Sequence, residues 1–327
     1  MKIKKRILFA IACLPLLSAT GCSVYDDEQN CDPDYNMKFI YDWNMSGGDA
    51  FPAQVNSVNL WVFNHDSGIL VAKYSDSGEA LSKKGYLLSL TDLQPGNYDF
   101  IAWCGLEGSQ SFTVPSDIST EKDLTCSMKT SSSDGKAVSD SYLSPLFYGS
   151  LNNQTVKDVR GETVVYTMYL MKDTNNINIS LQHSNDDVLD ADDFTIYMTD
   201  VNSNLDFDNS LMSGPLVYYY PWDISSGYLD SSADGLNYIK FELSTNRLMA
   251  DQNPVITIID KESGATVYSI PRVEWAKVLR SEQNMSMTDQ EYLDREHEYT
   301  IMLYLVGDEG SGGWKAASIV INGYEMM

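Results

Sequence analysis

Two stretches decide the fold class of this chain: Val58-Asn59-Leu60-Trp61-Val62-Phe63 and Tyr98-Asp99-Phe100-Ile101-Ala102-Trp103. Both are rich in the β-branched and aromatic residues that fit a pleated sheet. A turn signal, Asp66-Ser67-Gly68, follows the first stretch, and another, Gln94-Pro95-Gly96-Asn97, comes directly before the second. Short apolar runs bounded by such turns predict antiparallel β-strands.

The same pattern recurs at Val164–Leu170 and Asn176–Leu181, whereas helical signals are few. We expect short helices around Val273–Leu279 and around Thr288–Leu293. In the second of these, Thr288 followed three residues later by Glu291 has the form of a capping box. Many short strands with frequent turns favour antiparallel β-sandwiches over βαβ units. The sequence therefore predicts an all-β protein with a few short helices.

The N-terminus has the layout of a signal peptide. Four basic residues between positions 2 and 6 precede the apolar run Ile7–Leu17, which is shorter than the roughly 20 residues of a membrane-spanning helix. Small residues then lead to Cys22, and this ending resembles a bacterial lipobox. We predict cleavage after Gly21 and lipidation of Cys22 by acyl chains such as palmitate. An ordinary signal peptide with a chance cysteine is the alternative.

The mature chain is strongly acidic. Removal of residues 1–21 takes away four positive charges, so the formal net charge falls from -24 to -28. Such a chain is repelled by phosphate backbones, which excludes nucleic-acid binding. The acidic cluster within Ser23–Glu28 resembles the surface-export signal of Bacteroidetes lipoproteins, with a solvated tether as the alternative. We therefore expect a lipoprotein at the cell outer membrane, exposed on the surface.

Length and composition suggest two domains of ordinary size. We place the boundary in the polar turn Met171–Asn175, and we read the Ser-, Thr-, Asp- and Gly-rich segment 127–141 as a long exposed loop. The predicted division is a signal peptide at 1–21, a lipidated tether at 22–36, an N-terminal β-sandwich at 37–172 and a C-terminal β-sandwich at 173–327.

Three cysteines remain after Cys13 leaves with the signal peptide and Cys22 carries lipid: Cys31, Cys104 and Cys126. An exported protein can form one disulfide among them and leave one thiol free. Three pairings are open, and none of the cysteines has metal-site spacing.

No motif in the chain demands an enzyme, a cofactor or a metal. The histidines His65, His183 and His297 lie far apart and lack partners at metal-ligand spacing, so we expect surface or packing roles. The segment Asp200–Asp208 mimics the start of an EF-hand loop. Leu205 stands where the loop needs Gly, and Leu211 stands where a bidentate Glu belongs. We favour a turn at a strand end over a calcium site.

Short motifs in consistent order carry a family resemblance over nearly the whole mature chain. They are Cys31-Asp32-Pro33, Met37–Met45, Asp49–Phe51, Val55, Val58–Phe63, Leu93–Tyr98, Ala102–Leu106, Asn246–Met249, Tyr292–Glu296 and Ile319–Tyr324. Together they resemble the minor fimbrium anchoring subunits of Bacteroidales type V pili. Cys104 departs from the family pattern, which leads us to expect glycine, and the departure leaves the cysteine pairing open.

The resemblance implies two transthyretin-like β-sandwich domains on a lipid anchor at the outer membrane. It also implies a role at the base of a fimbrium (the pilus), where the anchor subunit holds pilin-like subunits and can limit the length of the fimbrium. Related stalk subunits polymerise by strand exchange, after an arginine-specific protease trims an N-terminal strand.

The arginine distribution bears on that mechanism. No arginine occurs between Cys22 and Arg160, so an arginine-specific protease has no site in the N-terminal strand region. Our hypothesis is that this chain keeps its first strand and its lipid, as an anchor should.

The C-terminal run Ala316–Asn322 has strand character. We predict that Ile319, Val320, Ile321 and Asn322 lie near or form the joint with the next subunit, because an exposed sheet edge can accept a partner strand. The alternative is an ordinary last strand of the second sandwich.

Two rival functions stay open. A surface glycan-binding lipoprotein would use exposed aromatic residues, and Tyr218-Tyr219-Tyr220-Pro221-Trp222 is the candidate platform, although a strand with a sandwich-facing side is the favoured interpretation of that run. A surface hydrolase would need a carboxylate pair, and nothing in the sequence selects one. The sequence leaves open which pilin is the partner and what surface a fimbrium would contact.

Overall fold

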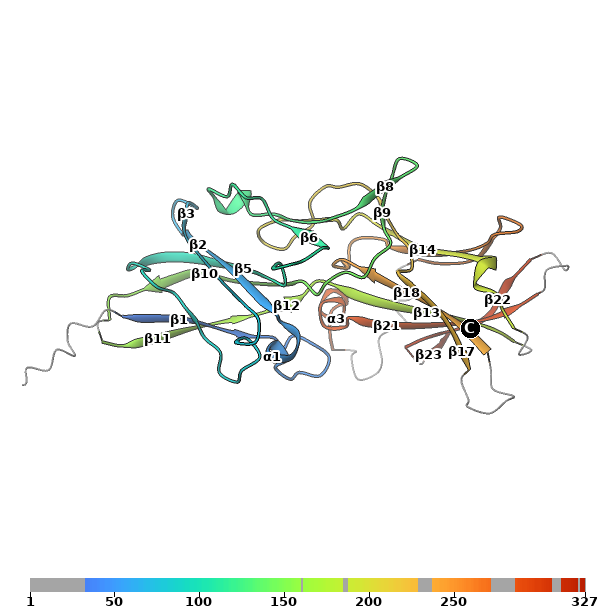
Figure 1. The fold of residues 1–327 in the computed structure, drawn as a ribbon, viewed down its shortest axis with the longest axis horizontal. Coiled ribbons are helices and arrows are strands. Elements are labelled where there is room, and N and C mark those ends of the chain that lie inside the picture. Colours follow the sequence, from blue (N-terminus) through green and yellow to red (C-terminus); the bar gives the residue numbers. More distant parts are fainter. Residues whose placement is uncertain are drawn as a thin grey trace, which may run out of the picture.

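The computed structural model describes residues 33–159, 161–184, 188–228, 237–271, 286–307, 313–322 and 324–326. These residues form mostly β-strands, as predicted (Figure 1). The α-helices among them are α1 (Phe51–Gln54) and α3 (Asp289–Arg295). The predicted helix at 288–293 is confirmed as α3, whose first turn is capped by the Thr288 hydroxyl accepting from the Glu291 N–H at 3.1 Å. The other predicted helix, at 273–279, lies outside the described residues.

The first part of the chain builds two facing sheets, which we call the N-terminal sandwich. One sheet has the order β11-β1-β4 and the other β12-β10-β5-β2-β3. Apolar side chains from both sheets close the core between them, including Met37, Leu60, Phe100 and Met168. The strands are β1 (Asp34–Ile40), β2 (Ser57–Asn64), β3 (Leu70–Ser77), β4 (Leu88–Ser89), β5 (Gly96–Cys104), β10 (Phe147–Val156), β11 (Thr163–Tyr169) and β12 (Met171–Lys172).

The two fold-deciding stretches, β2 and β5, are buried on both faces. Their even-numbered residues face the core of the N-terminal sandwich, whereas Trp61, Phe63, Ile101 and Trp103 belong to a second cluster on the other face. A small sheet, β15-β7-β6, contributes Phe112, Cys126, Met128 and Leu205 to that cluster. Its strands are β6 (Phe112–Thr113), β7 (Cys126–Met128) and β15 (Asn204–Leu205).

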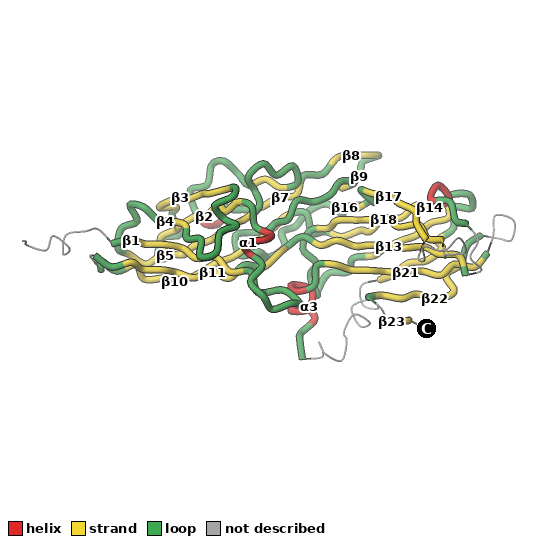
Figure 2. The backbone as a smooth tube through the Cα atoms, turned by 60° about the horizontal axis from the view of Figure 1, so that its bottom comes forward, coloured by secondary structure: helices red, strands yellow, loops and turns green. Residues whose placement is uncertain are grey.

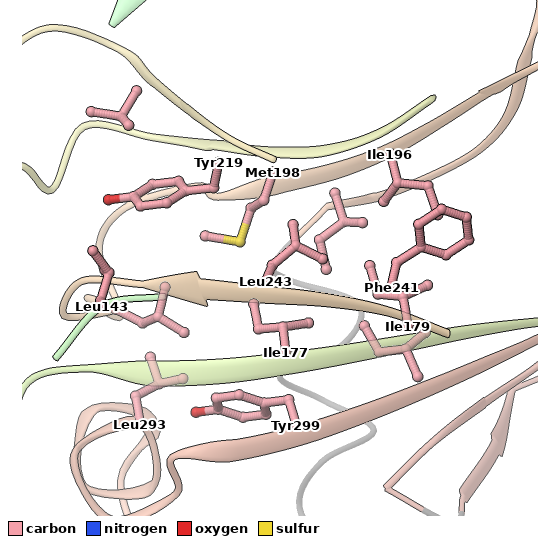
Figure 3. Close-up of a cluster of buried hydrophobic side chains, with 14 of the residues drawn as sticks. Leu143, Ile177, Ile179, Ile196, Met198, Tyr219, Phe241, Leu243, Leu293 and Tyr299 are labelled. Carbon is pink, nitrogen blue, oxygen red and sulfur yellow. The ribbon is translucent and has the colours of Figure 1, made fainter. Parts of the chain in front are cut away.

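The later part of the chain forms the C-terminal sandwich from two six-stranded sheets, ordered β17-β18-β13-β21-β22-β23 and β20-β19-β14-β16-β9-β8. Figure 3 shows Tyr219, Met198 and Ile196 packing toward Ile177, Ile179, Phe241 and Leu243 across the layer between them. The strands are β8 (Ser131–Ser133), β9 (Lys136–Ser139), β13 (Asn175–His183), β14 (Phe194–Asp200), β16 (Val217–Tyr219), β17 (Asp223–Tyr228), β18 (Asn237–Thr245), β19 (Val255–Asp260), β20 (Thr266–Pro271), β21 (Glu298–Val306), β22 (Lys315–Ile321) and β23 (Tyr324–Met326).

Most strand pairs are antiparallel, but β1 with β11, β13 with β21, and β9 with β16 pair in parallel. Each parallel pair joins segments far apart in sequence, because parallel neighbours need long connections. The predicted boundary between residues 172 and 173 falls between β12 and β13. The pairs β7–β15 and β9–β16 cross that boundary, so the division into two domains stays a proposal.

The segment 127–141 differs from the predicted long exposed loop. It contains the end of β7 and the β8–β9 hairpin, and β9 adds to the edge of the β16 sheet. The polar composition misled the prediction because β8 is exposed throughout, while in β9 the residues Val138 and Ser139 are buried. Gly135, with φ of +74°, makes the tight turn between the two strands.

The molecule is elongated, and its two ends carry different parts of the chain. Figure 1 and Figure 2 both show β1 and β11 toward one end and β22 and β23 toward the other. The helix α3 lies between these ends, beside β12. Neither described helix is long and apolar enough to cross a membrane.

Candidate functional site

A buried ion-pair cluster lies where the two sandwiches meet. The guanidinium of Arg247, in the turn after β18, contacts Asp294 of α3 through Nη2 at 3.1 Å and 3.3 Å. Its Nε lies 3.8 Å from Asp173, in the short connection from β12 to β13. Arg247 also donates to the carbonyl of Asn209. One cation thus joins three chain segments that are far apart in sequence.

Asp173 is completely buried in this cluster. Its Oδ1 accepts from Asn209 Nδ2 at 2.9 Å, and its backbone N–H donates to the Leu146 carbonyl at 2.8 Å. Burial raises the pKa of Asp173 to about 7, although the Arg247 guanidinium and the Asn209 amide partly lower it. The predicted polar turn Met171–Asn175 therefore contains polar residues that are buried in the folded protein.

Asparagine side chains extend the polar cluster behind Arg247. Asn202 donates to the carbonyls of Asn246 and Arg247 at 3.1 and 2.9 Å, and Asn246 Nδ2 donates back to the Asn202 carbonyl at 2.6 Å. The hydroxyl of buried Tyr219 donates to Asn202 Oδ1. These bonds fix the turn that presents Arg247, because buried polar groups in irregular backbone need partners.

Gln290 ties α3 to the same turn. Its amide nitrogen donates to Asp294 Oδ1 at 2.8 Å and to the Leu248 carbonyl at 3.2 Å, and its Oε1 accepts from the Ala250 N–H at 2.8 Å. Two of these bonds, to Leu248 and Ala250, link the helix to the segment Asn246–Ala250, and the third orients Asp294 within α3. The helix and the turn form one unit.

A cleft of about 710 Å³ opens at the surface of the junction. Trp43 and Tyr169 of the N-terminal sandwich and Arg295 of α3 line it. The Arg295 guanidinium lies 3.7 Å from the centroid of the Trp43 ring, and its Nε contacts Glu291 at 3.1 Å. This cation–π contact joins the segment after β1 to the helix of the C-terminal sandwich.

The contacts at the junction hold the two sandwiches together. Arg247 faces both Asp173 and Asp294, and within the described residues no three His, Cys, Asp or Glu side chains cluster as metal ligands. His297 packs at the same junction, and burial lowers its pKa to about 3, so it is a neutral packing group.

His65 takes a structural role elsewhere. Its Nδ1 contacts both carboxylate oxygens of Asp99, at 3.0 and 2.9 Å. Asp99 Oδ1 also accepts from the Asn153 N–H at 2.6 Å, at the bulge between β5 and β10 where Asn153 has φ of +52°. Asp99 therefore fixes the bulge through Asn153 and holds the His65 ring directly.

The predicted lipidation site, Cys22, and the predicted cleavage site, Gly21, both lie outside the described residues. The predicted joint falls on β22 and the turn after it. Ile319 and Ile321 point into the core, with 4% and 0% exposure. Val320 pairs with both Met302 of β21 and Glu325 of β23, so β22 already has two neighbours. Asn322 accepts from the Thr300 N–H at 2.7 Å.

Other candidate residues have structural partners. In the segment Asp200–Asp208, Asn202 bonds the Arg247 turn and Asp208 bonds Ser210, while β15 pairs with β7. Cys104 and Cys126 are both buried and free, and burial raises the pKa of both thiols. Cys31 lies outside the described residues.

Sequence reasoning missed the roles of Asp173, Arg247 and Asp294. The motifs Asn246–Met249 and Tyr292–Glu296 carried the family resemblance, but nothing in them shows that they touch. The signal that could have found them is a lone arginine beside apolar residues, since an arginine in such a place needs a buried carboxylate partner.

Comparison with known proteins identifies relatives of this fold. A family model described as fimbrillin-A associated anchor proteins Mfa1 and Mfa2 matches residues 27–326. No curated protein matches the chain.

Several solved structures resemble this chain over most of its length. A Bacteroides thetaiotaomicron protein provisionally described as an adhesin has 29% identity and a TM-score of 0.77, over 90% of this chain and 98% of its own. A second one from the same species, provisionally described as polysaccharide binding, has 28% identity and a TM-score of 0.74 over the same shares. The fimbrial anchor protein Mfa2 of Porphyromonas gingivalis, at 16% identity, shares the fold with a TM-score of 0.66, over 90% of this chain and 99% of its own.

Proposed function

The chain belongs to the family of fimbrillin-A associated anchor proteins Mfa1 and Mfa2, and we propose that it is the lipid-anchored subunit that tethers a fimbrium to the outer membrane. The family is one of structural fimbrial proteins, which points to an assembly role and away from catalysis. The finer parts of the proposal are the lipid on Cys22, the retained first strand, the C-terminal joint and the limit on fimbrium length.

The observation that carries the proposal is the placement of the two ends of the chain. β1, whose first three residues are the last three of the predicted tether, lies at one end of the elongated molecule, and β22 and β23 lie toward the other (Figure 1). A lipid at Cys22 would hold the first end at the membrane and leave the second end pointing away. The ion-pair cluster of Arg247 lies between them and would carry tension from one sandwich to the other.

Retention of the first strand has a physical basis. β1 places Tyr35, Met37 and Phe39 in the core, with exposures of 4%, 0% and 2%. It also lies between β11 and β4, so its backbone bonds both neighbours. Loss of such a strand would open the N-terminal sandwich. Because no arginine occurs between Cys22 and Arg160, an arginine-specific protease has no site to cut there.

The C-terminal joint would use the edge that β23 forms. β23 has three residues and is the last strand of its sheet, with β22 on its inner side. A partner strand can add beyond β23 or replace it beside β22, because both arrangements supply backbone hydrogen bonds. A subunit held by lipid at its other end would stop further addition there, which would limit the length of the fimbrium.

The first experiment tests the lipid anchor. In cells that make the fimbrium, Cys22→Ala should lose metabolic labelling by alkyne-palmitate and release the protein, with its pilin-like partners, into the medium. Cys31→Ala is the matched control, because it removes a nearby cysteine that has no lipobox before it, and it should stay in the membrane. Retention of label and membrane location in Cys22→Ala would refute the anchor.

The second experiment tests the joint. A chain ending at Asn322 lacks β23 and exposes the edge of β22, so its yield of co-purified fimbrial subunits should differ from wild type by several-fold. Val71→Ser, on the exposed edge strand β3, is the control and should behave as wild type. Equal yields from all three chains would place the joint elsewhere.

Polysaccharide binding is a second candidate function. One relative with 28% identity is provisionally described as polysaccharide binding. Within the Tyr218–Trp222 run, the favoured interpretation as a strand with an inward side holds, because Val217 and Tyr219 of β16 are buried. Trp222 remains 38% exposed, and this exposed ring is the specific observation that keeps the second function open.

A further inference from the structure

Two exposed aromatic rings meet on the C-terminal sandwich although their residues are 80 positions apart in the sequence. Tyr142, in the connection from β9 to β10, and Trp222, just before β17, have ring centroids 5.3 Å apart in an edge-to-face arrangement. They remain 46% and 38% exposed. The backbone N–H of Trp222 donates to the Glu242 carbonyl at 2.9 Å, which fixes that ring beside β18.

The rings form one wall of a groove of about 300 Å³. Its floor is the outer face of the sheet at β18, β13 and β21, where polar residues alternate with the buried Ile177, Phe241 and Tyr299. The floor residues that the proposal uses are Asn176, Asn178, Lys240, Glu242 and Glu298.

Cross-strand register sets these polar groups side by side. Asn178 of β13 lies opposite Glu242 of β18, and Asn176 lies opposite Glu298 of β21. Asn176 is held in place, because its Nδ2 donates to Glu298 at 2.7 Å and its Oδ1 accepts from Ser244 at 3.1 Å. The groove therefore presents amide, carboxylate and ammonium groups in a fixed row next to aromatic faces.

This combination fits one class of ligand. A sugar ring has an apolar C–H face that packs on an aromatic ring and an edge of hydroxyl groups that bond amides and carboxylates. Lys240 and Glu242 form an ion pair, and Asn176 bonds Glu298. A purely apolar ligand would remove these polar groups from water without offering them any further hydrogen bond, which costs free energy. A phosphate-bearing ligand would meet Glu242 and Glu298 in a chain of formal net charge -24.

We propose that the Tyr142–Trp222 groove binds a neutral oligosaccharide, with the two aromatic rings as the stacking wall and Asn178, Glu242 and Lys240 as hydrogen-bonding partners. The proposal rests on the second candidate function, polysaccharide binding, and is independent of the anchor role. It differs from a platform made of the whole Tyr218–Trp222 run, since Tyr219 is fully buried and Tyr218 and Tyr220 pack against Tyr197.

The test is affinity electrophoresis of the full mature chain in native gels that contain α-mannan, xyloglucan or polygalacturonate. We expect at least one neutral polymer to retard the wild type. Trp222→Ala and Tyr142→Ala should each weaken that retardation by about tenfold or more, because aromatic anchors dominate binding energy. Asn178→Ala, which changes an outward side chain of β13, should weaken the retardation by about threefold or more. This variant tests the groove even if an aromatic variant does not fold.

Tyr169→Ala is the matched control, since Tyr169 is 58% exposed and lies in the junction cleft instead. It should be retarded as strongly as wild type. Equal retardation of all variants by a neutral polymer would overturn the groove and leave polysaccharide binding standing. Retardation by polygalacturonate alone would overturn the neutral ligand proposed for the groove and leave polysaccharide binding standing. Retardation by none of the polymers would overturn both the groove and the second candidate function.

Discussion

The Arg247 guanidinium reaches both carboxylate oxygens of Asp294, at 3.1 and 3.3 Å, and so fastens the turn after β18 to helix α3. The Arg247 side chain is only 11% exposed, and the Asp173 side chain beside it is not exposed at all. The cation therefore compensates two carboxylates in a place that water barely reaches. Removal of one partner of such a group leaves an uncompensated buried charge.

Arg247→Met should lower the free energy of unfolding by about 3–5 kcal/mol, because Asp173 and Asp294 lose their shared cation. Urea unfolding followed by tryptophan fluorescence measures this change. Arg295→Met is the matched control. Arg295 is the last residue of the same helix, its guanidinium lies 3.7 Å from the centroid of the Trp43 ring, and its loss should cost only about 1 kcal/mol. Equal losses in the two variants would mean that the buried cluster adds nothing beyond a surface contact.

Asp173 should make stability fall as the pH rises from about 4 to about 7. Its pKa is about 7 in the folded protein, against 3.8 for the ordinary carboxyl group, so the folded state binds the proton more tightly. Stability is then highest below the unfolded pKa and is lost as the pH passes through the folded one. The difference corresponds to about 4 kcal/mol in the limit of an isolated group.

Asp173→Asn keeps the shape of the side chain and removes the titration, so its stability should change less over that pH range. Urea unfolding at several pH values from 4 to 8 gives the two profiles. Asp134→Asn, in the exposed β8–β9 turn, is the control and should follow the wild type. A wild-type slope that persists in Asp173→Asn would assign the pH dependence to other groups.

The sequence predicted the strands well where apolar runs were continuous. The runs that contain Val58–Phe63 and Tyr98–Trp103 became β2 and β5, and the run Asn176–Leu181 lies within β13. β2 and β5 are buried on both faces, because the small sheet β15-β7-β6 packs against the face that points away from the core of the N-terminal sandwich. A nearly unbroken apolar run is the signal for burial on both faces.

The junction could not be predicted from the chain alone. Arg247 and Asp294 are 47 residues apart and Asp173 lies 74 residues before Arg247, so only the folded backbone brings them together. For the same reason, the sequence predicted the segment Met171–Asn175 only as a polar turn at the domain boundary. In the fold, Asp173 contacts Arg247 and Asn209, and Asn175 donates to the Asn246 carbonyl.

Gly105 should tolerate no side chain. Its φ is +92°, and a Cβ atom there would lie 2.1 Å from the carbonyl oxygen of Pro145. Gly105→Ala should therefore cost about 3 kcal/mol or more in unfolding free energy. Gly47 is the control, because it has φ of +64° but nothing within 4 Å, so Gly47→Ala should cost only the about 1–2 kcal/mol of a left-handed backbone. Thermal unfolding of both variants separates steric contact from backbone strain.

The outer edge of β11 should be the part of the described sheets most prone to association with another strand. The Asp34 N–H donates to the Glu162 carbonyl, and the Leu170 N–H donates to the Ile40 carbonyl. In a parallel ladder every second residue of a strand bonds the same neighbour. Since Glu162 and Leu170 bond β1, the backbone groups of the even-numbered residues between them, 164, 166 and 168, also point to β1. The N–H and C=O groups of Thr163, Val165, Thr167 and Tyr169 therefore face the open edge.

β11 also lacks the usual protection of an edge. It has seven residues without charge, Pro or Gly, and Val165 is 44% exposed. The edge strand β3, by contrast, contains Lys73 and Asp76. Natural edge strands avoid association through charges, prolines or short length. Among the described edge strands of six or more residues, β11 is the one that has none of these.

Val165→Lys should reduce the initial rate of light scattering during refolding by about twofold or more, because a charge on the edge opposes strand addition. Val165→Pro should do the same, since the N–H that it removes faces the open edge and the ladder with β1 stays intact. Val71→Lys is the control: it adds the same charge at a similarly exposed position, 48%, on the already charged strand β3, and should change the rate little. If Val71→Lys slowed aggregation as much as Val165→Lys, the effect would come from net charge and not from the edge of β11.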